Sequence, residues 1–239
     1  MHLQYLKRFY PDFKDKKILD LGCGRGDFLL ECYKEELNVV GIDINLEYIK
    51  ISEEKLRKNG FKPNIIHGKG ENLPFENNYF DFINCVEVLE HTKNPKSILE
   101  ECYRVLKNDA KIFLTTHNKT SIKDSHFPGI YFTKWLPRGL AKKMIKLIGS
   151  KNDASVIDQL YYFNYSEFKK MVKKIGFKIS DLRLAQINNP ELIYNNEIKN
   201  ILLFLKKNRL KFFSDLVYLF LRRFYFNNCH ILLIKNLKS

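Results

Sequence analysis

The residues best suited to chemistry form the segment DLGCGRG at residues 20–26. Glycines let a backbone approach a ligand closely and adopt positive φ angles, and a helix that follows such a loop offers unpaired N–H groups. A dinucleotide-binding pattern would place its third glycine at position 27, where this chain has Asp27. Asp20 would also repel a diphosphate and attract a cationic amino-acid moiety. The segment therefore favours a ligand with a positively charged part over a dinucleotide.

A second candidate binding residue is Asp43, which follows the apolar run VVGI at residues 39–42. A carboxylate in this place can accept hydrogen bonds from both ribose hydroxyls of an adenosine. An Asp in the same place can also be the N-cap of the next helix. The glycine loop upstream favours the ribose interpretation.

These residues must be positioned by alternating strands and helices. Apolar runs predict strands at residues 17–21, 38–42, 64–67, 80–84 and 111–115. Helical periodicity lies between them, at residues 27–36, 46–58 and 95–106. Such alternation predicts βαβ units and a doubly wound α/β fold whose parallel sheet is covered on both faces.

After Asn118 the regular alternation ends. We expect a basic helix near residues 140–148, a helix capped by Ser166 that ends before Gly176, and strands at residues 177–184 and 230–234. We interpret the whole chain, residues 1–239, as one domain with three parts. These are a cofactor-binding half, a lid or acceptor insertion and a basic helical insertion, at residues 15–117, 118–163 and 188–226.

Four motifs together carry a family resemblance. The glycine loop is followed by ENLPF at residues 71–75, EVLEH at residues 87–91 and RVLK at residues 104–107. With these segments the sequence resembles the class I S-adenosylmethionine-dependent methyltransferases that have LPF and E-x-L-E-H segments. The resemblance implies a seven-stranded sheet in the order 3-2-1-4-5-7-6, mostly parallel, with helical insertions after strand five and between strands six and seven.

The resemblance also implies S-adenosyl-L-methionine as cofactor. Its methionine part would lie over the glycine loop, its ribose on Asp43 and its adenine near residues 69–71. Lys69 departs from the family, which often has an acidic residue there, so Glu71 or a backbone carbonyl must accept from the adenine amino group. The cofactor-binding residues implied in this way are Asp20, Gly22, Cys23, Gly24, Gly26, Asp43, Ile44, Gly70, Glu71, Cys85 and Glu87.

For a hydroxyl acceptor, methyl transfer needs in-line alignment and is helped by a general base. Candidate bases lie near the carboxyl ends of the strands, where open α/β sheets bind ligands. His117 follows the fifth strand, and His126, with Asp124 two residues before it, lies in the insertion. His91 is a further candidate. For each histidine, a structural or surface role is the competing interpretation.

The spacing of Glu87, Glu90 and His91 raises the question of a metal. On an α-helix these three side chains would share one face. A similar triad is associated with magnesium in small-RNA 3′-terminal 2′-O-methyltransferases and in some quinone-biosynthesis O-methyltransferases. Many relatives without a metal have the same letters, so we expect no metal and interpret the three residues as the pocket wall.

The charge of the chain is very uneven. Its formal net charge is +14, yet residues 1–117 hold 18 Lys and Arg against 19 Asp and Glu, whereas residues 118–239 hold 23 against 8. The second half should therefore attract an anionic partner. We see neither a signal peptide nor an apolar run long enough for a transmembrane helix, and the five scattered cysteines fit reduced thiols, so we expect a cytoplasmic protein.

The basic half is where the acceptor should be recognised. Residues 126–138 are similar to lids of methyltransferases linked to surface-polysaccharide and glycolipid assembly. Residues 198–226 read as a basic amphipathic helix pair, suited to an anionic membrane surface at the inner face. A helical cap on the sheet, or RNA binding through lysines and aromatic rings, would give the same pattern.

Several functions remain open. The main prediction is O-methylation of a lipid-linked or phosphorylated saccharide, or a similar small acceptor, by a protein that can associate with the inner membrane surface. The alternatives are an RNA methyltransferase, a quinone-type small-molecule O-methyltransferase, and a cofactor-binding protein without catalysis. The last is disfavoured because the motifs and the inserted segment are intact.

Overall fold

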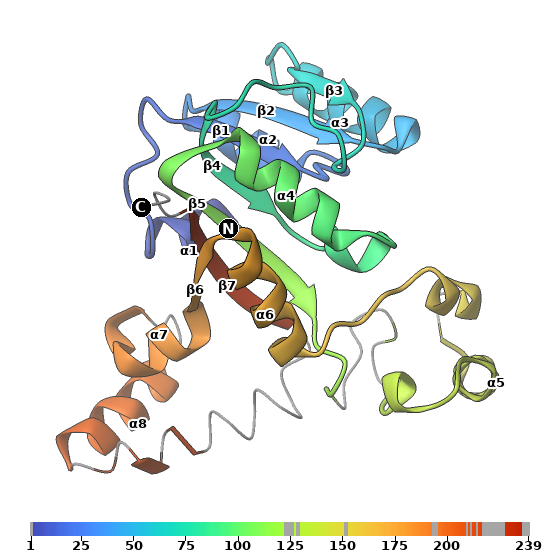
Figure 1. Ribbon diagram of the computed structural model, residues 1–239, viewed down its shortest axis with the longest axis vertical. Coiled ribbons are helices and arrows are strands. Elements are labelled where there is room, and N and C mark those ends of the chain that lie inside the picture. The colour runs from blue at the N-terminus through green and yellow to red at the C-terminus, as the bar shows by residue number, and fades with distance from the viewer. Residues whose placement is uncertain are drawn as a thin grey trace.

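The fold is built on one sheet of seven strands (Figure 1). The strands lie in the order β3-β2-β1-β4-β5-β7-β6, and β7 pairs antiparallel with both of its neighbours while the other pairs are parallel. This confirms the predicted fold class. The structure is a computed structural model, and it describes residues 2–121, 127, 130–150, 153–192, 196–208, 210, 212–213, 215–216 and 228–235.

In the first half of the chain the strands and helices lie close to the predicted boundaries, except that the fifth strand begins at residue 106 instead of 111 and takes the last residue of the predicted helix 95–106. The strands are β1 (Lys17–Leu21), β2 (Asn38–Asp43), β3 (Ile65–His67), β4 (Phe80–Cys85), β5 (Leu106–His117), β6 (Phe177–Asp181) and β7 (Asn228–Lys235). The α-helices are α1 (His2–Lys7), α2 (Asp27–Lys34), α3 (Leu46–Lys58), α4 (Pro95–Val105), α5 (Arg138–Ile148), α6 (Tyr165–Ile175), α7 (Leu182–Asn188) and α8 (Asn196–Lys207). Short 3₁₀ turns are η1 (Leu89–His91), η2 (Thr133–Trp135), η3 (Ala154–Asp158) and η4 (Pro190–Leu192).

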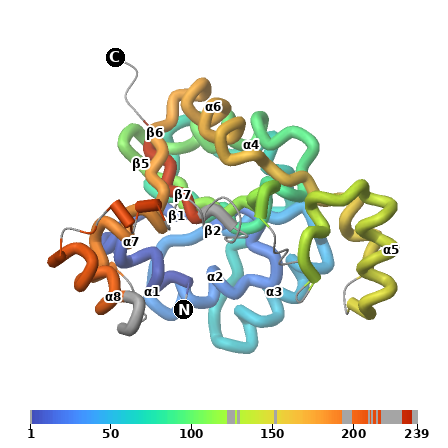
Figure 2. Tube along the Cα trace, turned by 90° about the horizontal axis from the view of Figure 1, so that it is seen from below, coloured from blue at the N-terminus to red at the C-terminus, as the bar shows by residue number. Residues whose placement is uncertain are grey.

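Helices cover both faces of the sheet, with α1, α2 and α3 on one face and α4 and α6 on the other (Figure 2). Successive side chains of a strand point to opposite faces, so Ile18 and Leu19 of β1 enter two different apolar clusters. Both residues are fully buried. This burial on both faces explains why the parallel strands are continuous apolar runs in the sequence.

Three local predictions need correction. The sixth strand ends at Asp181 rather than residue 184, because the Asp181 carboxylate accepts from the backbone N–H groups of Arg183 and Leu184 and caps α7. The N-cap of α6 is Asn164 and not Ser166, whose N–H donates to the Asn164 side chain. Helix α1 was not predicted at all.

The second half of the chain adds helices beside the sheet. The insertion after β5 contains η2, α5 and η3. Side chains of α5 and η3 share a small apolar cluster with Phe127 and Ile130. Helix α8 lies in the insertion between β6 and β7, and most of residues 209–227 lie outside the described part of the chain. Among the described residues, no helix is both long and apolar enough to cross a bilayer.

The close packing of α3 against the glycine loop yields a prediction for Gly26. Gly26 has a φ of 76°, and a Cβ there would lie 2.0 Å from the Ser52 Oγ, which is buried. Gly26→Ala should lower the free energy of unfolding by about 2 kcal/mol, through backbone strain and overpacking. Gly139→Ala is the matched control, because a Cβ at this position would meet nothing within 4 Å. Equal urea midpoints for the two variants would contradict this account.

Candidate functional site

The glycine loop between β1 and α2 lies at the carboxyl edge of the sheet. Gly22, Gly24 and Gly26 all have positive φ angles, of 70°, 50° and 76°. The N–H groups of Gly22 and Cys23 donate to the Ile42 carbonyl, at 2.8 and 3.1 Å, which fixes the loop on β2. A Cβ at Gly24 would meet only a backbone oxygen at 4.0 Å. The loop is therefore open at its centre, where a ligand can approach the backbone.

Asp43, the last residue of β2, holds the loop from its other side. Its Oδ2 accepts from the Gly24 N–H at 2.8 Å and its Oδ1 from the Asn45 N–H at 2.8 Å. Asn45 is the N-cap of α3, so Asp43 does not have the capping role that the sequence left open. Each carboxylate oxygen can accept a second hydrogen bond, as two adjacent ribose hydroxyls would require.

Asp20 is a buried carboxyl group at the same edge. Its Oδ1 accepts from the Asn84 amide at 2.7 Å, and the Asn84 Oδ1 lies 2.9 Å from His2 Nε2. Burial raises the pKa of Asp20 to about 7, partly offset by the Asn84 hydrogen bond. A cationic group bound beside Asp20 would favour its charged form. The site thus fits a ligand with a positively charged amino-acid part.

The remaining predicted cofactor residues have different surroundings. Ile44 is exposed beyond the end of β2, and Gly70 lies against the Leu21 and Ile98 side chains. Glu71 is exposed and its Oε1 accepts from the Thr92 hydroxyl at 2.7 Å. The Cys85 side chain is buried in the core, so only its backbone is placed to meet a ligand.

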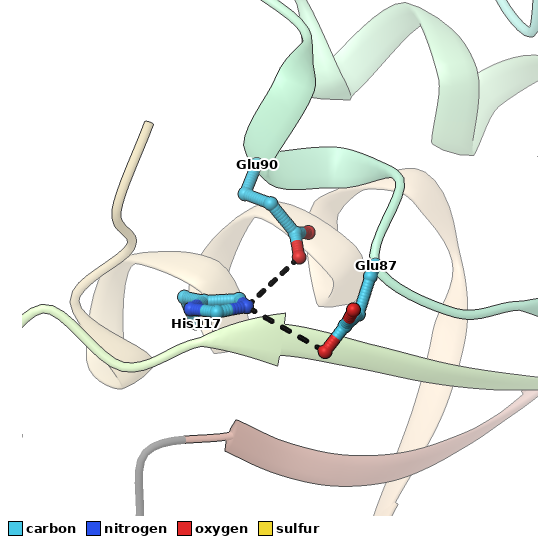
Figure 3. A group of neighbouring side chains, drawn as sticks. All are labelled: Glu87, Glu90 and His117. Carbon is cyan, nitrogen blue, oxygen red and sulfur yellow. Dashed lines mark ion pairs between the residues drawn. The ribbon is translucent and has the colours of Figure 1, made fainter. Parts of the chain in front are cut away.

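Two carboxylates and one imidazole meet beside this edge, as Figure 3 shows. Glu87 and Glu90 follow β4, and His117 ends the neighbouring parallel strand β5. His117 Nε2 lies 3.0 Å from the Glu90 Oε1 and 3.9 Å from the Glu87 Oε1. The Glu90 and His117 side chains are fully buried, whereas the Glu87 side chain is half exposed.

This cluster differs from the triad considered from the sequence. The segment is a 3₁₀ turn with Glu87 at a φ of 55°, so it is not an α-helix with one shared face. His91 is exposed and outside the cluster, and His117 takes its place. The adjacent carboxyl ends of β4 and β5 could have indicated from the sequence that His117 lies beside Glu90. His126 and Asp124, the other predicted catalytic residues, lie outside the described residues.

The cluster allows two kinds of chemistry. A buried imidazole oriented by a carboxylate can accept a proton from a substrate hydroxyl. Alternatively, two carboxylate oxygens and one imidazole nitrogen are a donor set for a divalent cation, and all three ligand atoms lie within 4.8 Å of one another. Glu87 adds a carboxylate that solvent can reach from the open side.

Together, the strand order, the open glycine loop and the aspartate after β2 define a Rossmann-like protein that binds a nucleoside-containing ligand at the carboxyl edge of its sheet.

Comparisons with known proteins indicate which Rossmann-like proteins the chain is similar to. Residues 19–114 match a family model described as a methyltransferase domain. The ubiquinone biosynthesis O-methyltransferase of Yersinia enterocolitica is 28% identical over 153 residues, which are 61% of this chain and 62% of that relative's length. Residues 19–114 therefore form a methyltransferase domain, and S-adenosyl-L-methionine is the cofactor that this domain and the ligand-bound neighbour below support. The chain spans less than two thirds of the length of the first relatives that it matches.

Two solved structures share the fold. The YcgJ protein from Bacillus subtilis has a TM-score of 0.61 at 16% identity, over 99% of this chain and all of that one. Phosphoethanolamine N-methyltransferase 2 from Haemonchus contortus, in complex with S-adenosyl-L-methionine, has a TM-score of 0.59 at 19% identity. That match covers 98% of this chain and 52% of the other. At these identities the likeness concerns the fold alone.

The buried Asp20 yields a prediction about stability and pH. Because its folded-state pKa of about 7 lies above the ordinary value of 3.8, the folded chain retains this proton where the unfolded chain loses it. Asp20 therefore makes the ligand-free protein less stable as pH rises from about 4 to about 7. Asp20→Asn should remove this slope and be more stable than the parent chain by about 4 kcal/mol at pH 8.

Urea unfolding of the two chains between pH 4 and pH 8 measures this difference. Asp109→Asn, at an exposed carboxylate, is the matched control and should follow the parent chain at each pH. If Asp20→Asn also followed the parent, burial of the charge would not be the cause.

Proposed function

We propose that the chain transfers a methyl group from S-adenosylmethionine to an oxygen atom of a small acceptor, a lipid-linked or phosphorylated saccharide being our leading candidate. The observation that carries the proposal is the fixed Asp43 carboxylate beside the open loop at Gly24, at a hydrogen-bond distance of 2.8 Å. The match of residues 19–114 to a methyltransferase domain supports the donor. The likeness to enzymes named as O-methyltransferases supports an oxygen acceptor.

The residues of the chain have distinct tasks in this reaction. When bound, S-adenosylmethionine supplies a methyl group that its sulfonium already activates. The glycine loop and Asp43 orient the nucleoside, and Asp20 favours the cationic amino-acid end. His117 accepts the proton of the acceptor hydroxyl, and Glu90 orients the imidazole through its contact with Nε2.

A pocket of about 540 Å³ next to the cluster has the size of a small-molecule site. A quinone-type acceptor is the second candidate, because the relatives named above are ubiquinone biosynthesis enzymes. An RNA acceptor would instead require a continuous basic path across the second half. A salt-dependent RNA gel shift and sedimentation with anionic vesicles separate RNA binding from attachment to a membrane surface.

The first test concerns the donor. Isothermal titration calorimetry should show binding of S-adenosylhomocysteine to the parent chain. Asp43→Ala should weaken this binding by about 100-fold, because two charge-assisted hydrogen bonds to the ribose are lost. Asp27→Ala, which removes an exposed carboxylate at the start of α2, should leave the affinity within about twofold. Undiminished binding by Asp43→Ala would refute the assigned role of Asp43.

The second test concerns the proton acceptor. With labelled S-adenosylmethionine and fractionated cell extract as the acceptor source, Glu90→Gln and His117→Asn should each lower the rate of methyl transfer by about 100-fold or more. Their affinity for S-adenosylhomocysteine should change little. His91→Asn is the matched control, because its imidazole is exposed and outside the cluster.

A chelator distinguishes the two chemistries of the cluster. If His117 is the proton acceptor, EDTA should leave the rate of methyl transfer unchanged. Loss of activity in EDTA that Mg²⁺ restores would overturn this assignment and make Glu87, Glu90 and His117 ligands of a divalent cation.

A further inference from the structure

The pocket of about 540 Å³ is formed by segments that are far apart in the sequence. It lies between the turn after β4, the segment after β5, the 3₁₀ turn η2, the start of α5 and the strap at residues 161–163. The lining residues are Thr92, Lys93, Pro95, Lys119, Thr133, Lys134, Leu136, Pro137, Arg138, Ile157, Leu160, Tyr161, Tyr162 and Phe163. Figure 1 shows α5 standing beside the sheet, joined to α6 by the segment that contains the strap.

The charge of this lining is wholly positive. Lys93, Lys119, Lys134 and Arg138 come from four different segments, and none of the lining residues is Asp or Glu. Within the part of the chain that the structure describes, no ion pair involves Lys93, Lys119 or Arg138. Several cations around one concave space focus a positive potential in it, which favours an anion.

Two of the cations are held in place by the pocket wall. The Arg138 guanidinium donates to the carbonyls of Asp158 and Leu160, at 2.9 and 3.0 Å, and uses only part of its five N–H groups. Lys134 Nζ donates to the Asn118 carbonyl at 3.2 Å and lies 5.0 Å from the centre of the Tyr162 ring. Because these contacts already restrict both side chains, less conformational entropy is lost when they bind an anion.

The strap joins this pocket to the cluster of Glu87, Glu90 and His117. The Tyr161 N–H donates to the Glu90 carbonyl at 2.8 Å, and the Phe163 N–H donates to the His117 carbonyl at 3.3 Å. The rings of His117 and Tyr162 lie 6.2 Å apart between centroids. The pocket wall is therefore in direct contact with the cluster through the strap, although His117 itself does not line the pocket.

The lining also suits the uncharged part of an anionic acceptor. Its other side chains include aromatic rings and apolar residues, among them Tyr161, Phe163 and Leu136. These provide flat and apolar surface for a sugar ring or a hydrocarbon chain. Four cations match a group with more than one negative charge better than they match a single carboxylate.

We propose that this pocket binds the phosphate or diphosphate group of the acceptor, between Lys93, Lys119 and Arg138. The proposal deepens the function proposed above and rests on it for the meaning of the bound anion. It names the chemistry that the acceptor must carry, whether that acceptor is a soluble phosphate ester or the headgroup of a lipid.

The test uses inorganic pyrophosphate as the probe. Calorimetry with the full chain loaded with S-adenosylhomocysteine should show saturable binding of pyrophosphate. The double variant Lys93→Ala, Lys119→Ala should raise the dissociation constant at least about tenfold, since two charge-assisted contacts are lost. The matched control is Lys143→Ala, Lys146→Ala, which removes the same charge from exposed positions of α5 that do not line the pocket. It should change the constant less than about twofold.

Vesicles distinguish the two sources of the phosphate. If the ligand is a lipid headgroup, the parent chain should sediment with vesicles that contain phosphatidic acid, and added pyrophosphate should release it from them. If the ligand is a soluble ester, pyrophosphate should bind equally well with and without vesicles. Equal losses in both double variants, unaltered binding in the pocket variant, or no binding of pyrophosphate by the parent chain would each overturn the proposal.

The same experiment separates this proposal from the proposed function. Binding of S-adenosylhomocysteine is measured first and depends on Asp43, which does not line the pocket. Failure of that binding, with pyrophosphate still bound by the unloaded chain through Lys93 and Lys119, would refute the methyl donor alone. Normal binding of S-adenosylhomocysteine without a pocket-dependent anion would refute the pocket alone.

Discussion

The binding edge of this protein depends on the hydrogen bond between the Gly24 N–H and the Asp43 carboxylate. It ties the loop after β1 to the end of β2, and the second Asp43 oxygen ties the same point to the start of α3 through Asn45. Three elements are thus fixed by one buried side chain. Because a buried carboxylate is costly unless its oxygens are satisfied, the loop and the aspartate constrain one another before any ligand binds.

A second network of polar side chains extends from this edge to helix α1. Asp20 accepts from Asn84, and Asn84 in turn faces His2 at the start of α1. Glu31 holds the same helix by accepting from the N–H groups of His2 and Leu3. Helix α1 therefore contributes to the polar surroundings of Asp20 as well as to the apolar packing of Leu3 and Leu6.

The sequence predicted the cofactor half well because its signals are local. Apolar runs separated by a glycine loop, and an Asp at a strand end, keep their meaning whatever surrounds them. Helix α1 was missed because it has only six residues, His2–Lys7. Its stability comes from packing and from the backbone hydrogen bond to the Glu31 carboxylate rather than from a local sequence signal. The end of the sixth strand was missed because the Asp181 cap competes locally with the apolar pattern of residues 177–184.

The cluster shows where local signals were insufficient. Periodicity grouped Glu87, Glu90 and His91 on one helical face, but a positive φ at Glu87 breaks that geometry. The partner of Glu90 is His117, and only the pairing of β4 with β5 brings the two together. The pocket could not be predicted from the sequence either, because its cations come from four segments that meet only in the folded chain.

The position of β7 has a consequence for how the chain reaches this state. This strand is made after β5 and β6 yet lies between them, and β6 has no other partner in the described sheet. Until residues 228–235 leave the ribosome, β5 keeps an open edge and β6 cannot join the sheet. The segment that ends in His117 pairs with the far end of the chain, at Asn228. During synthesis, strands β1 to β4, with the glycine loop and Asp43, can therefore be ordered well before β5 has its second neighbour.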